Sequence, residues 1–205
     1  MRLLELFSGT KSVGKVAEQL GYEITSLDLK NADINTDILN WDYTIYPIGY
    51  FDVVWASPPC QEYSKAKSRG NRNIEYANQI VLKTLEIIHY LQPTYWMIEN
   101  PQTGLLKKQS FMDTIPFADV DYCKYDMPYR KRTRLWNNIT TWKPQPLCKK
   151  DCNYMIGNRH IGSCGCGGKG QGHKIRYTDK SYTVNDKYKI PPKLIEDIFK
   201  CITIE

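Results

Sequence analysis

The sequence lacks both an export signal and a membrane-spanning run. Glu5 lies inside the first apolar run, and no apolar stretch approaches the roughly 20 residues that a bilayer requires. We therefore expect a cytoplasmic protein that has no membrane partner. Its 205 residues are enough for one domain of moderate size with a small appendage.

Two common nucleotide-binding motifs are also absent. Gly9 and Gly14 do not form G-x-G-x-x-G, which disfavours a dinucleotide site, and the phosphate-cradling G-x-x-x-x-G-K-[ST] does not occur. The predicted elements are a strand over 2–7, a small-residue turn over 8–14, a helix over 15–20 and a strand over 23–27 that ends at Asp28. This order is typical of a nucleotide-cofactor site, in which the acid accepts hydrogen bonds from ribose hydroxyls. The alternative is an ordinary turn of an α/β domain without a ligand.

Acidic residues are scarce in the C-terminal half. The whole chain carries a net charge of +6, but residues 122–193 alone hold 16 basic and four acidic side chains. Such a basic part is typical of polyanion binding, although a solvated lysine-rich surface is the alternative. We therefore expect a catalytic body over 1–121 and 183–205, and a small basic nucleic-acid-recognition segment over 122–182.

The seven cysteines are an odd number in a chain without an export signal, which favours reduced thiols that act as metal ligands or catalysts. Residues 141–182 show little regular structure, and so long an irregular segment needs a cross-link to hold it in place. Cys148, Cys152 and His160 have the spacing of a structural zinc site. The fourth ligand is expected to be Cys123, Cys164 or Cys166. Free cysteines in a flexible loop are the alternative.

One of the cysteines follows a buried strand. The apolar run that starts at Val53 ends in Ser-Pro-Pro, which places Cys60 on a stiff loop at the carboxyl end of a strand, where ligands bind in α/β sheets. Cys60 is placed there to act as a nucleophile, or else is a buried structural cysteine. A helix over 75–91 and a strand over 95–98 follow, so a right-handed crossover brings Glu99 close to Cys60.

The remaining elements are weaker. Residues 105–121 read as a helix and then a strand. Residues 130–134 contain four cations, and if this run lies on a strand, Arg130, Arg132 and Arg134 share one face. Together with flanking aromatics they fit phosphate contact and stacking. A strand over 181–184 and a helix over 190–199 follow, and we expect that helix to pack back on the N-terminal body.

The order of these motifs resembles that of the cytosine-C5 DNA methyltransferases. The motifs that carry the resemblance are Phe7-Ser8-Gly9, Asp28, Pro59-Cys60-Gln61, Glu99-Asn100, Arg132-x-Arg134 before Leu135-Trp136, and Ile190-Pro191-Pro192-Lys193-Leu194. They span most of the chain, and its compact size looks most like small members from phages and other viruses. The resemblance implies an α/β fold with the Rossmann-like sheet of S-adenosylmethionine-dependent methyltransferases and a small irregular Cys/His-containing insertion. We also expect a monomer, which would lie in the host cytoplasm if the source is viral.

The resemblance also implies a mechanism. Cys60 would add to C6 of a cytosine turned out of DNA, Glu99 would hold N3 and the exocyclic amine, and the catalytic arginines Arg132 and Arg134 would hold O2 or a flanking phosphate. Basic neighbours, Lys65 among them, are expected to favour the thiolate. The residues that would bind S-adenosylmethionine are Phe7, Ser8, Gly9, Thr10, Asp28, Leu29 and Pro58.

Three other functions remain open at this point. Ser57-Pro58-Pro59 also fits amino methyltransferases, but Cys60 replaces the aromatic ring that would stack on the base there. A catalytically silent nucleic-acid-binding protein could keep the same fold. RNA could be the substrate instead of DNA, because phosphate contacts and stacking serve both.

Overall fold

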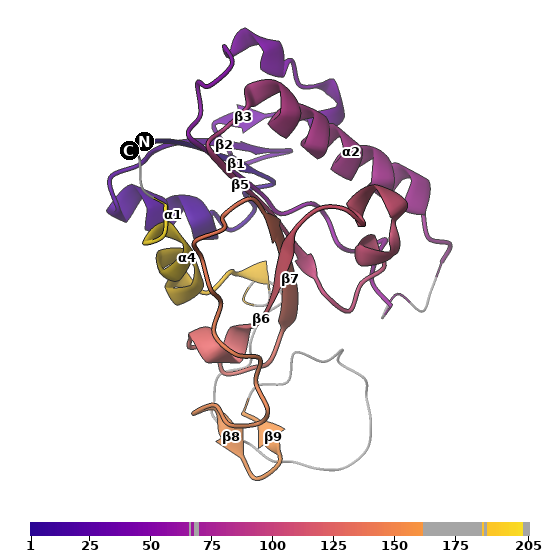
Figure 1. Ribbon diagram of the computed structural model, residues 1–205. Helices are drawn as coiled ribbons and strands as arrows, with labels where there is room; N and C mark the ends of the chain where they lie inside the picture. The colour runs from indigo at the N-terminus through magenta and orange to yellow at the C-terminus, as the bar shows by residue number, and fades with distance from the viewer. Residues whose placement is uncertain (66, 68–69, 162–185, 187, 203–205) are drawn as a thin grey trace.

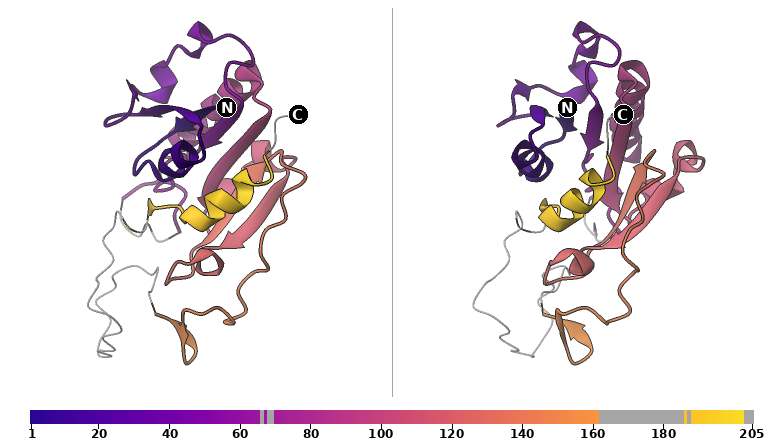
Figure 2. Two further views of the ribbon diagram at one scale, coloured as in Figure 1. Left: turned by 90° about the vertical axis from the view of Figure 1, so that its left-hand side faces the viewer. Right: turned by 60° about the vertical axis from the view of Figure 1, so that its left-hand side comes forward.

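A computed structural model describes residues 1–65, 67, 70–161, 186 and 188–202. Helices cover both faces of a central sheet (Figure 1; Figure 2). In spatial order its strands are β3 (Ile34–Asn35), β2 (Glu23–Asp28), β1 (Arg2–Leu6), β4 (Val53–Ala56), β5 (Tyr95–Pro101), β7 (Arg132–Asn137) and β6 (Phe117–Asp121). The strands β3 to β5 are parallel, and β7 runs antiparallel to β5 and to β6. The predicted α/β architecture with a mainly parallel sheet is confirmed.

The two faces of the sheet bury separate apolar clusters, because side chains alternate along each strand. Leu3 packs in the cluster that contains the helices α1 (Ser12–Gln19) and α4 (Pro192–Phe199), and Leu4 packs in the cluster under α2 (Ile74–Leu91). The rings of Tyr22 and Phe199 lie 5.1 Å apart, so α4 packs back on the N-terminal body as predicted. The short 3₁₀ helices are η1 (Ile38–Asn40), η2 (Tyr43–Ile45), η3 (Leu106–Lys108), η4 (Ser110–Met112) and η5 (Tyr122–Tyr125). Within the described residues, no helix is long and apolar enough to cross a membrane.

Two element boundaries differ from the sequence-based expectation. Helix α1 begins at Ser12 and not at residue 15, because the carboxylate of Glu5 accepts hydrogen bonds from the first backbone N–H groups of this helix. Strand β5 continues through Pro101, because it pairs with β7 beyond the end of its pairing with β4. Glu99 therefore lies inside the strand and not after it. The strand predicted over 181–184 lies outside the described residues.

The segment predicted for nucleic-acid recognition, residues 122–182, contains strand β7 of the central sheet. After β7, the described residues 138–161 are irregular except for an antiparallel hairpin of β8 (Met155–Ile156) and β9 (Arg159–His160). This part of the chain runs along the β6–β7 pair and ends near η5, away from α2 and β3 (Figure 1; Figure 2). The division into a catalytic body and a recognition segment stays a prediction.

Candidate active site

A cleft of about 560 Å³ opens at the carboxyl ends of three neighbouring strands. Phe7 and Ser8 line it directly after β1, Cys60 lines it on the loop after β4, and Glu99 lines it from β5. Strands β4 and β5 are parallel neighbours, as the crossover argument predicted, so the fold brings Cys60 and Glu99 into one cleft. The volume is in the range of ordinary small-molecule sites.

The turn between β1 and α1 forms one wall of this cleft. Gly9 has a φ of 44°, in the left-handed region that glycine adopts without strain. The carboxylate of Asp28, at the end of β2, accepts the N–H of Gly9 at 2.9 Å and that of Leu29 at 2.7 Å. The hydroxyl of Ser8 is buried and has no hydrogen-bond partner within the described part of the chain. A polar ligand atom would satisfy this hydroxyl.

A second cleft, of about 520 Å³, adjoins the first and shares Phe7, Asp28 and Pro59 with it. Its wall is mainly apolar and includes Leu27, Ile38, Ala77 and Ile80. An apolar wall beside a carboxylate suits an aromatic ring that is attached to a sugar. The predicted cofactor-binding residues all line one or both clefts: Phe7, Ser8, Gly9, Thr10, Asp28, Leu29 and Pro58.

Glu5 supports the same turn from below. Its side chain projects from β1, is almost fully buried, and accepts the N–H groups of Val13 and Gly14 at 3.2 and 3.0 Å. Burial raises its pKa to about 7, while these two N–H groups and Lys11 act in the opposite direction. The acid therefore titrates near neutral pH at the start of helix α1.

The loop that carries Cys60 is held from two sides. The side-chain amide of Asn100 donates to the carbonyl of Pro58 at 2.9 Å, and the N–H of Ser57 donates to the carbonyl of Leu6 at 3.2 Å. Asn100 is buried in β5, so the strand that carries Glu99 also fixes the loop of Cys60. The sequence analysis gave Asn100 no such role.

The electrostatics of Cys60 correct one expectation. Burial raises the pKa of its thiol, Glu99 raises it further, and the cation that opposes both is Lys131. The expectation that Arg132, Arg134 and Lys65 favour the thiolate is wrong for this structure. Cys60 rests as a thiol at neutral pH and must lose its proton during a reaction.

Two residues that the sequence analysis missed hold the carboxylate of Glu99. The hydroxyl of Tyr122 donates to Oε1 at 3.0 Å, and Lys131 Nζ lies 3.5 Å from the same atom. Burial and the charge of Glu99 raise the pKa of Tyr122 well above its usual value, so Tyr122 keeps the proton that it donates. Lys131 lines the cleft, and its side chain is only 14% exposed.

The two predicted catalytic arginines lie outside the cleft. Arg132 and Arg134 share one face of β7, as expected, but Glu99 pairs with Leu135, and this register puts Glu99 on the opposite face. Arg132 forms a bidentate ion pair with Asp121 at 2.7 and 3.0 Å. Arg134 forms another with Asp119, over the ring of Phe117. Their catalytic role stays a prediction.

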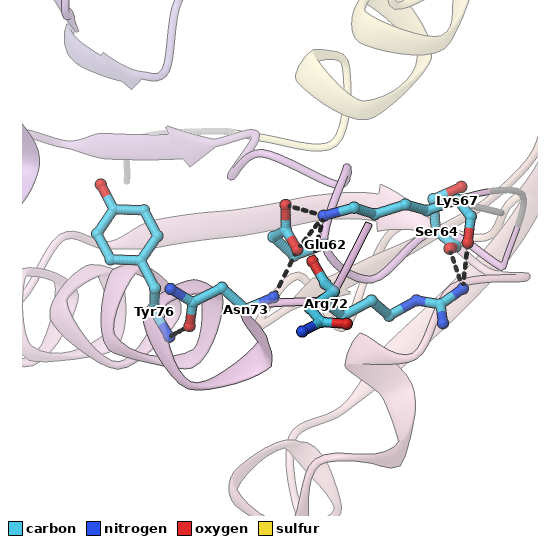
Figure 3. Close-up of polar contacts among 7 residues, drawn as sticks. Glu62, Ser64, Lys67, Arg72, Asn73 and Tyr76 are labelled. Carbon is cyan, nitrogen blue, oxygen red and sulfur yellow. Dashed lines mark hydrogen bonds and ion pairs between the residues drawn. The ribbon is translucent and has the colours of Figure 1, made fainter. Parts of the chain in front are cut away.

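The loop between Cys60 and α2 is held by its own charged residues (Figure 3). The carboxylate of Glu62 accepts from Lys67 Nζ at 2.6 Å and from the N–H of Asn73 at 2.7 Å. Arg72 donates to the carbonyls of Ser64 and Lys67. Lys67 and Arg72 are thus engaged by other described residues of the loop, whose ends at Glu62 and Asn73 line the second cleft.

A separate Cys/His group lies near η5. Cys123, Cys148, Cys152 and His160 place their ligand atoms within 4.8 Å of one another. This group unites three of the residues predicted for a metal site with Cys123, one of the expected fourth ligands. Cys164 and Cys166, the other two candidates, lie outside the described residues.

A sequence model described as C-5 cytosine-specific DNA methylase matches residues 1–115, more than half of the chain. The chain belongs to this family. The matched residues include the turn after β1, Cys60 and Glu99. The predicted class, DNA (cytosine-5)-methyltransferase, is confirmed by the family.

The relatives agree with this membership. A protein of frog virus 3 (isolate Goorha) is named "Probable DNA (cytosine-5)-methyltransferase". It is 38% identical to this chain over an alignment of 221 residues, gaps included, which covers 97% of this chain and 98% of that protein. Among solved structures, an Entamoeba histolytica methyltransferase matches with a TM-score of 0.55 at 16% identity over 78% of this chain. The S. pombe Dnmt2 methyltransferase matches with a TM-score of 0.50 at 16% identity over 66% of this chain. This chain spans 61% and 49% of the length of those two structures, which share its fold.

Proposed function

We propose that this chain transfers a methyl group from S-adenosylmethionine to C5 of cytosine in DNA, through a covalent bond between Cys60 and a base that has left the duplex. The observation that carries the proposal is the shared cleft of Cys60 and Glu99. Cys60 follows β4 and Glu99 lies in β5, its parallel neighbour in the sheet. The same cleft is lined by the turn after β1, and the second, mainly apolar cleft adjoins it.

The chain's residues fit S-adenosylmethionine. Asp28 would accept the ribose hydroxyls, since each of its oxygens receives one backbone N–H and keeps a second lone pair. The apolar wall around Ile38 and Ile80 would hold the adenine ring. The hydroxyl of Ser8, which has no partner among the described residues, would meet a polar atom of the ligand. When bound, the cofactor supplies an electrophilic methyl group.

Cys60 supplies the nucleophile that cytosine itself lacks. As its proton leaves, Sγ would form a bond to C6, and the electrons of the C5–C6 double bond would attack the methyl group from C5, while the bond from this methyl to the sulfonium sulfur breaks and that sulfur leaves as a neutral thioether. Loss of the C5 proton to a water molecule would then restore the double bond and expel the thiolate. The fixed loop around Cys60 supports this role, because the attacking atom must be held near one face of the base.

Glu99 would relieve the charge that develops on the ring, by sharing a proton with N3 and accepting from the exocyclic amine. Tyr122 and Lys131 both reach its Oε1, which leaves Oε2 to meet the base. Lys131 is at the same time the cation that favours the Cys60 thiolate. We assign Tyr122 and Lys131 the role of positioning and charge-balancing residues for Glu99.

A base that is paired in a duplex could not reach a half-buried thiol inside a cleft, so we propose that the target base leaves the helix, at a cost of a few kcal/mol. Phosphate contacts from the basic 122–182 segment would offset this cost. Lys131, which belongs to that segment, lines the cleft.

The test is transfer of tritiated methyl from S-adenosylmethionine to unmethylated DNA by wild type, Cys60→Ala and the matched control Cys201→Ala. Cys201 is another half-buried free cysteine, and it lies just after α4. We expect label at C5 of cytosine with wild type and the control, and none with Cys60→Ala. Label that survives in Cys60→Ala would contradict the thiolate mechanism and favour amino methylation. Label on RNA alone would identify RNA as the substrate, and cofactor binding without transfer to either polymer would identify a silent binding protein.

A further inference from the structure

We propose that Cys123, Cys148, Cys152 and His160 bind one structural Zn²⁺ ion that fastens the irregular segment after β7 to the central sheet. The four side chains come from η5, from the segment after β7 and from strand β9. Residues that are up to 37 positions apart in sequence thus converge on one point.

The distances suit a tetrahedral ion. Bonds of about 2.3 Å to sulfur and about 2.0 Å to nitrogen at tetrahedral angles place a sulfur and a nitrogen about 3.5 Å apart. Cys148 Sγ and His160 Nε2 lie 3.5 Å apart. Cys123 and Cys148 are buried, while Cys152 and His160 are half-buried, as in a closed structural site at a domain edge.

The donor types select the metal. Three thiols and one imidazole form the Cys₃His set of structural zinc sites, and soft sulfur ligands exclude magnesium and calcium. The N–H of Lys150 donates to Cys148 Sγ at 3.3 Å, a contact that favours the thiolate form a metal requires. All three cysteines are free in the structure, so no disulfide competes for them there.

The site would fasten the segment to β6 and β7, which follow the cleft-lining strand β5 in the sheet. The N–H of Cys148 donates to Asp121 at 3.0 Å, and the same carboxylate forms the ion pair with Arg132 of β7. Lys124 of η5 pairs with Asp151 at 2.8 Å, between two of the metal ligands. In the part of the chain that the structure describes, Cys148 is the buried core residue of 148–161, so the ion would supply a cross-link where apolar packing is sparse.

The first experiment measures zinc in the full-length protein by elemental analysis after purification in reductant and dialysis against metal-free buffer. We expect one zinc per chain in wild type and its loss in Cys148→Ser. Two matched controls, Cys201→Ser and Cys164→Ser, should keep the ion. Far less than one zinc per chain in folded wild type would overturn the site, and loss of zinc in Cys164→Ser would overturn the ligand set.

A second measurement does not depend on a variant that folds. Wild type loaded with Co²⁺ in place of zinc should show the strong visible bands of a tetrahedral site and the near-ultraviolet charge-transfer bands of thiolate ligands. Removing the ion with a chelator should increase amide hydrogen exchange in residues 148–161, while the affinity for S-adenosylmethionine stays as in the loaded protein. Octahedral cobalt, unchanged exchange, or a Cys148–Cys152 disulfide in the reduced preparation by mass spectrometry would contradict the proposal.

Discussion

The buried acid beneath the cofactor turn should make the stability of this protein fall as the pH rises toward neutral. Glu5 is 4% exposed, and its pKa in the folded chain is raised from 4.5 to about 7, chiefly by burial. Between these two pH values the folded chain holds a proton that the unfolded chain has released. The stabilising effect of that proton is therefore complete below pH 4.5 and is lost as the pH rises through 7.

The size of the effect follows from the shift. A difference of about 2.5 pKa units corresponds to about 3 kcal/mol at about 1.4 kcal/mol per unit. Glu5→Gln cannot titrate, and its amide oxygen can still accept one of the two N–H bonds from Val13 and Gly14. The free energy of unfolding of the variant minus that of wild type should therefore increase by about 3 kcal/mol between pH 4.5 and pH 8.

Urea denaturation followed by tryptophan fluorescence at several pH values measures this difference, since all other titrating groups contribute equally to both proteins. Glu23→Gln, which removes a carboxyl group from an exposed position of β2, is the matched control. If the Glu5→Gln difference were the same at every pH, the pKa of Glu5 would be equal in the folded and the unfolded chain, and the raised pKa of this buried acid would be refuted.

Three further predictions concern the cleft. Asp28→Ala should raise the Kd for S-adenosylmethionine at least about tenfold in calorimetry, because it removes the acceptor that holds Gly9 and that, in our proposal, binds the ribose; an unchanged Kd would contradict this placement. Tyr122→Phe should lower kcat about tenfold to hundredfold with the cofactor Kd unchanged, because Glu99 loses a hydrogen-bond donor worth about 1.5–3 kcal/mol. If kcat and the affinity for the cofactor fell by the same factor, Tyr122 would have a merely structural role. The rate of methyl transfer should rise with pH up to at least 9.0, because the pKa of the Cys60 thiol is raised above that value; a plateau near pH 7 would contradict a resting thiol.

Those parts of the cleft that are set by the order of strands and helices along the chain could be predicted from the sequence. Cys60 and Glu99 each come with a short apolar strand, and one helix joins the two strands, so the handedness of the crossover places them together. Asp28 could be placed in the same way, at the end of the strand after the first turn and helix. In a parallel strand–helix–strand unit, the right-handed crossover fixes which strand ends lie next to each other.

The partners of Glu99 could not be predicted, because they depend on an antiparallel pairing between distant strands. The register that sets Leu135 opposite Glu99 turns Lys131 into the cleft and Arg132 away from it, and a shift of one residue would reverse the two. The run of four cations over 130–134 was visible in the sequence, but which of them faces the cleft was not. Tyr122 gave no signal at all, since it begins the short 3₁₀ helix η5 directly after β6.

The proposed metal ligands depend on both kinds of information. The spacing of Cys148, Cys152 and His160 was visible in the sequence, whereas the position of Cys123 beside them follows only from the placement of η5. The length of the segment that the ligands fasten was likewise visible from composition. Its attachment through Asp121 was not, because it uses a backbone N–H.

The central claim is that Cys60 forms a covalent bond to the target base. Fluorine at C5 of cytosine cannot leave as a cation, so methyl transfer to 5-fluorocytosine stops at the bonded adduct. The measurement is denaturing mass spectrometry of wild type after incubation with S-adenosylmethionine and random-sequence DNA that contains 5-fluorocytosine. The account predicts a protein–DNA adduct that maps to Cys60 and depends on the cofactor. Methyl transfer to ordinary cytosine without any adduct on the fluorinated DNA, or an adduct on another residue, would contradict it.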